Sequence, residues 1–378
     1  MKRLQLALAV GLIFMGLIFF ADSAVAAPWI SARAYSVFAL ETGQLLEGKN
    51  VTASLPPAST TKIMTALLSL DYLDLDEKAV VSQRAERTPP TSIGLRAGQE
   101  IKVRDLLIAS LLTSANDATV VLAERMAGSE EIFSYLMTKK AVVLGATSTD
   151  FKNSNGLPAK GHLSSCRDLF LISREALRRP FFAETVARTE AVIQHPGYPQ
   201  GKLIRNTNRL LTSYPGVKGI KTGTTDAAGK CLVSLASRQD RHLITVVLRA
   251  GDRYRDSIAM LDYAFTSFQL QKVIDHNQVY KSLRVDNGDL AKVAVYPAHD
   301  VTLWLPEEGL RHVEKRVILD YRPRAPIKKG DRIGTLEVYY KGELAGETGL
   351  VAGASVEKMP RGIWKLVKRA VDLRPGSV

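Results

Sequence analysis

The apolar residues of this chain change their spacing several times, and each change predicts a different kind of structure. In residues 31–50 apolar and polar positions alternate around a turn sequence at 41–44, which predicts a β-hairpin. Apolar positions with helical spacing follow in residues 63–70, 103–111 and 118–126. These three stretches predict three helices after the hairpin.

A second group of strands is predicted further along the chain. Residues 216–224, 231–236 and 243–248 are predicted to be strands, separated by Gly229 and the cluster at 238–241, which is typical of an antiparallel meander. An amphipathic helix is expected at 258–268. Because helices lie between strands at both ends, we predict an α+β domain over residues 27–275, with an antiparallel sheet, completed by the N-terminal hairpin, and a helical cluster.

The last third of the chain has a different character. Short strand-like runs recur between residues 279 and 340, and turn sequences such as 286–288 and 328–331 separate them. They predict a separate, small all-β domain at 276–358.

Residues 359–378 are expected to form a short C-terminal amphipathic helix. Apolar residues, including Trp364, fill one half of a helical wheel, whereas Lys365, Lys368 and Arg369 lie on the other half. A basic face opposite an apolar face with tryptophan is typical of a helix that lies on an anionic membrane surface. The alternative is a helix that docks on the chain's own β-rich domain.

The N-terminus has the layout of a secretory signal peptide. A basic start precedes an almost purely apolar run from Leu4 to Phe20, and small residues at 24–26 form a cleavage site. The run is short for a bilayer span, which favours cleavage over an uncleaved anchor. We therefore predict a signal peptide at 1–26 and an exported mature chain.

Charge narrows the choice of partners. The 378 residues include 51 Lys and Arg against 38 Asp and Glu, a net charge of +13. Residues 1–26 hold two cations and one acid, so the mature chain keeps +12. An exported basic protein fits anionic lipid or acidic cell-wall polymers. The sequence lacks zinc-finger spacing and basic stretches interleaved with aromatics, so we expect no nucleic-acid partner.

Two cysteines, Cys166 and Cys231, permit one disulfide in an exported protein. Cys231 lies inside an apolar run, however, where a thiol behaves as a small buried hydrophobe. Two unpaired thiols are therefore favoured over a disulfide.

Three short polar motifs occur in one order. Ser-Thr-Thr-Lys at 59–62 opens the first predicted helix, Ser-Ala-Asn at 114–116 lies between the second and third helices, and Lys-Thr-Gly at 221–223 ends a predicted strand. Each motif alone is a weak signal and is better explained by a helix cap or a turn. The three together, each in its structural setting, indicate acyl-transfer chemistry.

The first motif suits nucleophilic catalysis. Ser59 and Lys62 are three residues apart, so their side chains share one helix face. A lysine whose pKa is lowered by burial and by neighbouring cations can take the serine proton. The start of the helix also favours the negative charge that develops during attack.

The other two motifs suit substrate binding. The hydroxyl of Ser114 and the amide of Asn116 can relay a proton and hold a peptide backbone. Lys221 offers a fixed cation for a carboxylate, and Gly223 leaves room for a substrate along the strand edge. The backbone N–H after Gly223 and that of Ser59 can together form an oxyanion hole.

With these motifs, the chain resembles the low-molecular-mass penicillin-binding proteins that act as serine-type D-Ala-D-Ala carboxypeptidases. Further blocks at 91–95, 151–158 and 219–229 look like family sequences, and the resemblance is strong over about 30–270. It implies a penicillin-binding/β-lactamase-like transpeptidase domain that removes the terminal D-Ala from peptidoglycan stem pentapeptides. β-lactams would be covalent inhibitors, and no metal or other cofactor is expected. Such proteins are often periplasmic and held on the outer face of the cytoplasmic membrane by a C-terminal tail.

The resemblance also implies roles for individual residues. Ser59 would be the acylated nucleophile and Lys62 its general base, with Ser114 as a further catalytic residue. The expected substrate-binding residues are Asn116, Lys221, Thr222, Gly223, Thr224 and Arg253. Thr224 stands where a branch of the family carries histidine.

Three alternatives remain at the sequence level. A β-lactamase shares the motifs, but residues 117–220 lack the glutamate loop that such enzymes use for fast deacylation. An endopeptidase that cuts peptide cross-links would keep the fold, although such members tend to lack the β-rich tail domain. The intact Ser59, Lys62 and Lys221 argue against a catalytically silent wall-binding protein. The six histidines are scattered, and we expect each to be structural or on the surface.

Overall fold

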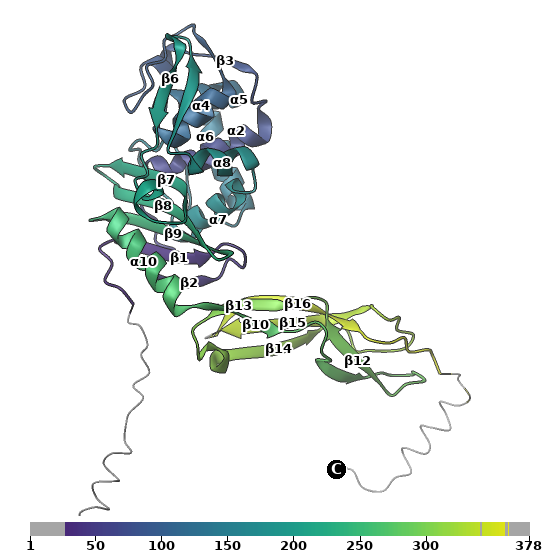
Figure 1. Cartoon of the computed structure of the whole chain (residues 1–378). Coiled ribbons are helices and arrows are strands. Elements are labelled where there is room, and N and C mark those ends of the chain that lie inside the picture. Colours follow the sequence, from purple (N-terminus) through teal and green to yellow (C-terminus); the bar gives the residue numbers. More distant parts are fainter. Residues whose placement is uncertain (1–26, 341, 360–361, 363–378) are drawn as a thin grey trace, which may run out of the picture.

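Two units placed end to end make up the chain in this computed structural model, which describes residues 27–340, 342–359 and 362 (Figure 1). The predicted signal peptide at 1–26 and nearly all of the predicted C-terminal helix lie outside these residues. Within the described ranges, no helix is long and apolar enough to cross a membrane.

A five-stranded antiparallel sheet forms the centre of the first unit, with the strand order β2-β1-β9-β8-β7. Its members are β1 (Ala34–Ala39), β2 (Leu45–Lys49), β7 (Val217–Thr225), β8 (Gly229–Arg238) and β9 (Arg241–Ala250). The N-terminal hairpin joins the meander through β1 and β9, where Val37 pairs with Thr245. The predicted α+β fold is thus confirmed, and β7 forms one edge of the sheet.

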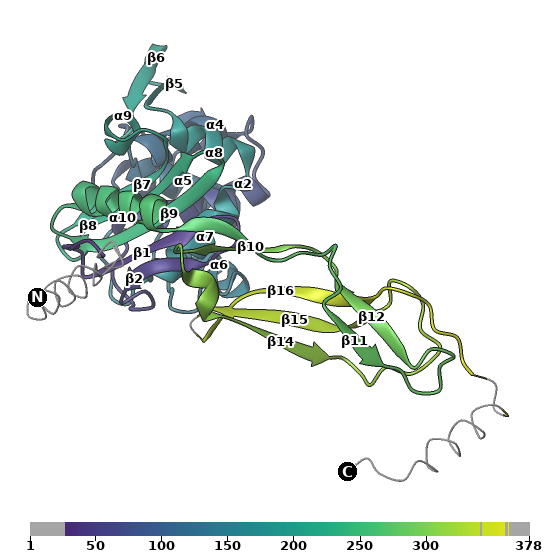
Figure 2. The ribbon, with the colours of Figure 1, turned by 60° about the horizontal axis from the view of Figure 1, so that its bottom comes forward.

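Both faces of this sheet are covered, which explains why β8 and β9 are buried and largely apolar on both sides. The helix α10 (Arg253–Ser267) packs on one face through residues that include Met260, Leu261 and Phe265. Figure 2 shows this helix lying across the sheet. A larger helical cluster covers the opposite face and holds the main hydrophobic core.

The helical cluster is built around α2, in which the eight residues from Lys62 to Ser69 are all buried. Its members are η1 (Ala58–Thr61), α2 (Lys62–Tyr72), α3 (Gln83–Glu86), α4 (Val103–Leu112), α5 (Asn116–Ala127), α6 (Glu130–Val143), α7 (Cys166–Ala176) and α8 (Pro180–Ala187). The short helix α9 (Leu210–Ser213) belongs to the other side, where Leu210 joins the core beneath α10. The side chains of Ser129 and Ser165 cap α6 and α7 by accepting hydrogen bonds from backbone N–H groups. The three helices expected from apolar spacing correspond to α2, α4 and α5.

Two small two-stranded sheets lie beside this cluster. β3 (Lys78–Val80) pairs with β4 (Glu100–Lys102), and β5 (Glu190–His195) pairs with β6 (Tyr198–Arg205). Most of their residues are at least partly exposed, so they give little apolar signal. The apolar pattern therefore did not predict them.

The second unit is all-β, as expected. β10 (Gln269–Ile274) pairs with β13 (Val301–Leu305), beside a sheet of order β11-β12-β16-β15-β14. The sheet consists of β11 (Lys281–Arg284), β12 (Lys292–Pro297), β14 (Val313–Leu319), β15 (Arg332–Tyr340) and β16 (Glu343–Ala352), and η2 (Gly309–His312) precedes β14. β10 precedes the expected boundary at 276, yet Val273 and Ile274 are buried in the core of this unit.

The two units meet at a specific contact. The Gln44 amide donates from Nε2 to the Trp304 carbonyl at 2.8 Å, and its Oε1 accepts from the Trp304 N–H at 2.9 Å. The Trp304 ring is buried in the cluster that includes α10, and the Arg241 guanidinium lies 5.5 Å from its centre. These contacts fasten the β-rich unit to the end of the central sheet.

Both cysteines are unpaired and buried, as the sequence favoured. Cys166 begins α7 and Cys231 lies in β8. Burial raises the pKa of both thiols, and that of Cys231 reaches about 11.

Candidate active site

Ser59 lies in the 3-10 turn η1, which leads directly into α2. Lys62 is the first residue of α2, and its Nζ lies 3.1 Å from Ser59 Oγ. The Lys62 side chain is fully buried, whereas Ser59 is partly exposed. A hydroxyl that a substrate can reach is thus backed by a buried amine.

Two further groups surround that amine. The Asn116 Oδ1 and the Asn155 carbonyl oxygen each lie 2.7 Å from Lys62 Nζ. The Asn116 Nδ2 donates to the Pro89 carbonyl, which fixes the orientation of the amide. Both oxygens near Lys62 can only accept, so a neutral amine gives them its two N–H groups and keeps one lone pair for the Ser59 hydroxyl proton. The arrangement suits a general base.

The charges in the site favour this neutral amine. Burial lowers the pKa of Lys62 well below its ordinary value, and the positive charge of Lys221 lowers it further against the opposing effect of Asp117. Burial, together with the nearby Arg253, lowers the pKa of Lys221 to about 7. The site thus shifts both lysines toward the neutral form, chiefly through burial.

The second motif lies where α4 leads into α5. Ser114 has a φ of +67° and is 8% exposed, and its Oγ has no hydrogen-bond partner within the described part of the chain. Asn116 begins α5 and faces Lys62. The Asp117 carboxylate accepts from the backbone N–H groups of loop 93–95, which fixes that loop. The Ser114 hydroxyl oxygen is thus buried, and within the described residues its hydrogen-bonding capacity is unused.

The third motif lies on the edge strand β7, beside η1. Lys221 is 1% exposed, and the Thr222 hydroxyl bonds to that of Thr207 at 2.6 Å. A Cβ added at Gly223 would lie 2.9 Å from the Ser59 backbone nitrogen. The sequence suggested that this glycine clears space for a substrate. In the structure, β7 also approaches η1 so closely that a side chain at this position would collide with η1.

Arg253 begins α10 and braces the end of β7. Its Nη1 donates to the carbonyls of Gly223 and Cys231 at 2.6 and 3.0 Å, and its Nη2 donates to Thr224 Oγ1 at 2.7 Å. The expected carboxylate-facing arginine therefore has partners on β7 and β8, while its charge still adds to the positive field around Lys221.

Sequence reasoning gave no role to the loop that carries Asn155 and His162. The block at 151–158 signalled its importance, but nothing in the sequence predicted that a backbone carbonyl would bind Lys62. Beside Ala58 this loop lines a cavity of about 240 Å³. Its lining residues are Pro56, Ala58, Gly156, Leu157, Pro158, Ala159, Lys160, His162, Thr225 and Ala227.

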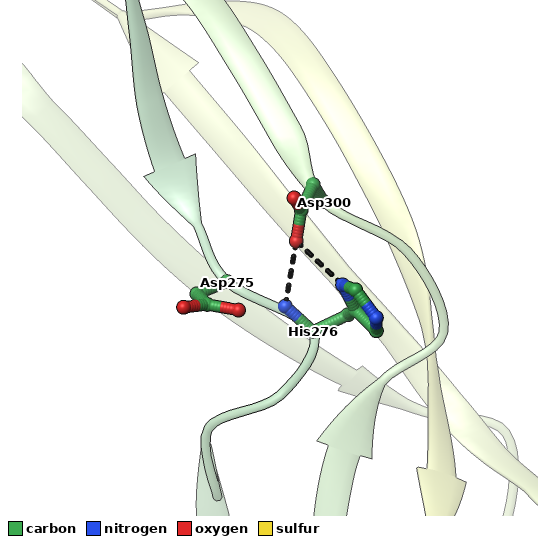
Figure 3. A group of neighbouring side chains, drawn as sticks. All are labelled: Asp275, His276 and Asp300. Carbon is green, nitrogen blue, oxygen red and sulfur yellow. Dashed lines mark hydrogen bonds and ion pairs between the residues drawn. The ribbon is translucent and has the colours of Figure 1, made fainter.

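A separate cluster of Asp275, His276 and Asp300 lies where β10 ends and β13 begins (Figure 3). The Asp300 Oδ1 accepts from the backbone N–H of His276 and lies 2.7 Å from its Nδ1. Lys272 pairs with the other Asp300 oxygen, also at 2.7 Å, and lowers the pKa of Asp300. Because Asp300 is already paired with a cation and two N–H donors, we assign the cluster to fastening these strand ends.

A serine–lysine pair beside the edge strand of a sheet between two helical layers defines the class of penicillin-binding serine peptidases. The family model described as D-alanyl-D-alanine carboxypeptidase matches residues 21–252, and that for the penicillin-binding protein 5 C-terminal domain matches residues 268–358. The chain belongs to the D-alanyl-D-alanine carboxypeptidase family.

Full-length relatives agree with this assignment. The chain is 33% identical over 375 residues to D-alanyl-D-alanine carboxypeptidase DacF of Bacillus subtilis, covering 95% of each protein. It is 31% identical to DacC of Escherichia coli, covering 90% of this chain and 88% of that one. The crystal structure of penicillin binding protein 5 from Haemophilus influenzae superposes with a TM-score of 0.75 at 26% identity, covering 88% of this chain and 100% of that chain.

Proposed function

We propose that this protein is a serine-type D-alanyl-D-alanine carboxypeptidase that removes the terminal D-Ala from peptidoglycan stem pentapeptides. The observation that carries the proposal is the environment of the Lys62 amine. Asn116 and Asn155 accept hydrogen bonds from its two N–H groups, and the third contact of the nitrogen is with Ser59 Oγ. Family membership supplies the substrate class.

Acylation follows from this geometry. The Ser59 hydroxyl proton passes to Lys62 Nζ while Oγ attacks the carbonyl carbon of the penultimate D-Ala. The Ser59 N–H stabilises the oxyanion. As the peptide C–N bond breaks, the leaving amine takes the proton from Lys62. Ser114 Oγ, which has no hydrogen-bond partner among the described residues, relays this proton. Water then hydrolyses the ester and frees Ser59. A β-lactam acylates Ser59 by the same steps, but its leaving amine remains tethered.

Recognition of the free carboxylate is assigned to β7. This strand is at the edge of the sheet, so an extended peptide can add to it through backbone hydrogen bonds. Lys221, with the hydroxyls of Thr222 and Thr224, then supplies a cation and donors for the terminal carboxylate. The positive charge of Arg253 behind Thr224 strengthens this preference for an anion.

A labelling experiment tests the assignment. A fluorescent penicillin should acylate the wild-type protein, and Ser59→Ala should abolish the label without unfolding the protein. The matched control is Ser54→Ala, because Ser54 is an exposed serine five residues upstream and should keep the label. A folded Ser59→Ala variant that still forms the adduct would overturn the role of Ser59.

Product analysis separates the remaining activities. Mass spectrometry of a D-Ala-D-Ala pentapeptide digest should show loss of one alanine from the C-terminus. Cleavage of cross-linked dimers without this product would favour an endopeptidase. Fast turnover of penicillin would favour a β-lactamase, although residues 117–220 lack the glutamate loop of that class.

We also assign export to residues 1–26 and periplasmic attachment at the outer face of the cytoplasmic membrane to residues 359–378. The basic and apolar sequence of the C-terminal segment supports attachment to anionic lipid. Mature full-length protein should sediment with phosphatidylglycerol vesicles, and salt should weaken binding. A variant that ends at residue 359 should stay in solution and cleave small peptides at the wild-type rate. Equal sedimentation of both proteins would place the membrane contact elsewhere.

A further inference from the structure

The peptide bond between Ala58 and Ser59 is held tightly on two sides. A Cβ added at Gly156 would lie 1.9 Å from the Ala58 carbonyl oxygen, and one added at Gly223 would lie 2.9 Å from the Ser59 nitrogen. Two glycine backbones, one from the loop and one from β7, therefore enclose this peptide. Its N–H is the group that faces the oxyanion in the proposed mechanism.

A chain of hydrogen bonds reaches the same peptide from a third side. Thr61 Oγ1 donates to the Ala58 carbonyl oxygen at 2.8 Å, and it lies 2.8 Å from His162 Nε2. His162 Nδ1 accepts from the Lys152 backbone N–H at 3.0 Å. The imidazole is 3% exposed, and its partner Thr61 is fully buried.

Donor and acceptor can be assigned for each hydrogen bond in this series. A backbone N–H can only donate, so His162 Nδ1 carries no hydrogen and the neutral ring has its proton on Nε2. That proton goes to Thr61 Oγ1, and the single hydroxyl hydrogen of Thr61 must then point to the Ala58 carbonyl. Burial lowers the pKa of His162 to about 4, so the ring stays neutral and keeps this tautomer at neutral pH.

We propose that His162 is a positioning residue, which acts through Thr61 on the Ala58–Ser59 peptide and so aims the Ser59 N–H at the oxyanion. This inference rests on the proposed acyl-transfer function, and it assigns a catalytic contribution to a histidine that acts through Thr61 on the nucleophile's backbone.

The conformation of Ala58 explains why such support is needed. Ala58 has a φ of +49°, a left-handed conformation that is unfavourable for alanine. Such a residue keeps its conformation only when its surroundings over-determine it. Without His162, the Thr61 hydroxyl is free to rotate away from the Ala58 carbonyl. The peptide plane can then tilt, and with it the N–H on its other side.

The test compares transition-state binding with ground-state binding. kcat and KM are measured with a D-Ala-D-Ala-terminated tripeptide, and affinity is measured for a peptide boronic acid, whose tetrahedral adduct with Ser59 presents an oxygen to the oxyanion position. Removing one oxyanion-hole donor outright typically costs about 10²–10³ in kcat, so misaiming it in His162→Phe should lower kcat roughly ten- to a hundredfold. KM should change little, and boronic acid affinity should fall by about the same factor as kcat.

Two amide variants separate positioning from packing. His162→Gln can place an N–H donor where Nε2 stood, so kcat and boronic acid affinity should return close to the wild-type values. His162→Asn places its amide near the Nδ1 position and does not reach Thr61, so it should resemble His162→Phe. The comparison of the glutamine and asparagine variants distinguishes positioning from packing even if the phenylalanine variant fails to fold.

A stability control comes from the same segment. Thr149 is buried, and its Oγ1 bonds to Asp168 and Ser164 rather than to Thr61. Thr149→Val should lower Tm and leave kcat and boronic acid affinity unchanged. Equal kcat and equal boronic acid affinity in folded Gln and Asn variants would overturn the positioning role. A wild-type protein that no penicillin acylates would instead overturn the proposed function.

Discussion

The positive charge of Lys221 on the edge strand β7 lowers the pKa of Lys62 at the start of α2. The two lysines are 159 positions apart in the sequence and come from opposite sides of the site. Their interaction lets one side chain attract a carboxylate while it helps to keep the other neutral. The anion-binding and proton-accepting parts of the site are therefore coupled electrostatically.

This coupling predicts a shift in the pH profile of Lys221→Gln. Losing the positive neighbour raises the pKa of Lys62, so the acid limb of β-lactam acylation should move to higher pH. Lys221→Arg keeps the charge and should leave the limb near its wild-type position or below it. Stopped-flow acylation rates between pH 5 and 10 measure this effect. A limb that does not move in Lys221→Gln would show that Lys62 titrates independently of β7.

A charge added at Asn116 should have a pH-dependent effect. In Asn116→Asp a carboxylate would face Lys62 Nζ at the 2.7 Å contact and raise the pKa of the lysine. We expect acylation to fall about tenfold or more at pH 7 and to recover at higher pH, because general bases act only when deprotonated.

Asn116→Ala is the matched control, because it removes the same contact without adding charge. Its acylation rate should be reduced by a similar factor at every pH. The same pH dependence in both variants would contradict the assignment of Lys62 as the base.

Blocking the substrate's carboxylate should cost much of the rate. If the terminal carboxylate binds beside Lys221, the amide of the same peptide leaves a buried cation without its partner, and kcat/KM should fall about a hundredfold or more. The ratio of kcat/KM for the free peptide to kcat/KM for the amidated peptide should be much smaller in Lys221→Gln than in the wild type. Equal hydrolysis of the free and amidated peptides by the wild-type protein would favour the endopeptidase.

Acid should destabilise the fold through His162. Its pKa is about 4 in the folded protein because burial outweighs the opposing charges of Asp150 and Glu130, and Lys152 and Lys62 lower it further. The unfolded chain binds a proton near pH 6.5, so the stability from the neutral ring is present above pH 6.5 and is lost as pH falls toward 4. Between pH 7 and 4.5 the loss is about 2–3 kcal/mol.

Urea unfolding of the wild-type protein and His162→Gln at both pH values measures this difference. Between pH 7 and pH 4.5 the free energy of unfolding should fall in both proteins. The fall should be smaller in the glutamine variant than in the wild type, by roughly the 2–3 kcal/mol attributed to His162. Parallel losses in the two proteins would assign the acid sensitivity to other groups.

The sequence predicted those parts of the molecule that repeat a pattern. α2, α4 and α5 show helical apolar periodicity, β8 and β9 are largely apolar, and Ser59 and Lys62 are neighbours on one turn. The role of the Asn155 carbonyl was not predictable from the sequence. It is a backbone atom 93 positions from Lys62, and only folding brings the two together. β16 was missed because Gly346 and Gly349 interrupt its apolar pattern.

His162 shows a different limit of sequence reasoning. Taken alone, a single histidine in a loop resembles any surface histidine. Only the packing of its loop against η1 gives it Thr61 as a partner. Similarly, Arg253 was expected to face the substrate, but α10 directs its guanidinium to the carbonyls of β7 and β8.

The two buried cysteines bear on the redox conditions in which this protein can work. A thiol reacts with oxidants and disulfides chiefly as the thiolate, and a raised pKa together with burial leaves almost none of it accessible at neutral pH. Cys166 and Cys231 should therefore remain reduced in oxidising surroundings once the chain has folded. The folded enzyme should need no disulfide-forming partner, and neither glutathione nor mild peroxide should alter its activity.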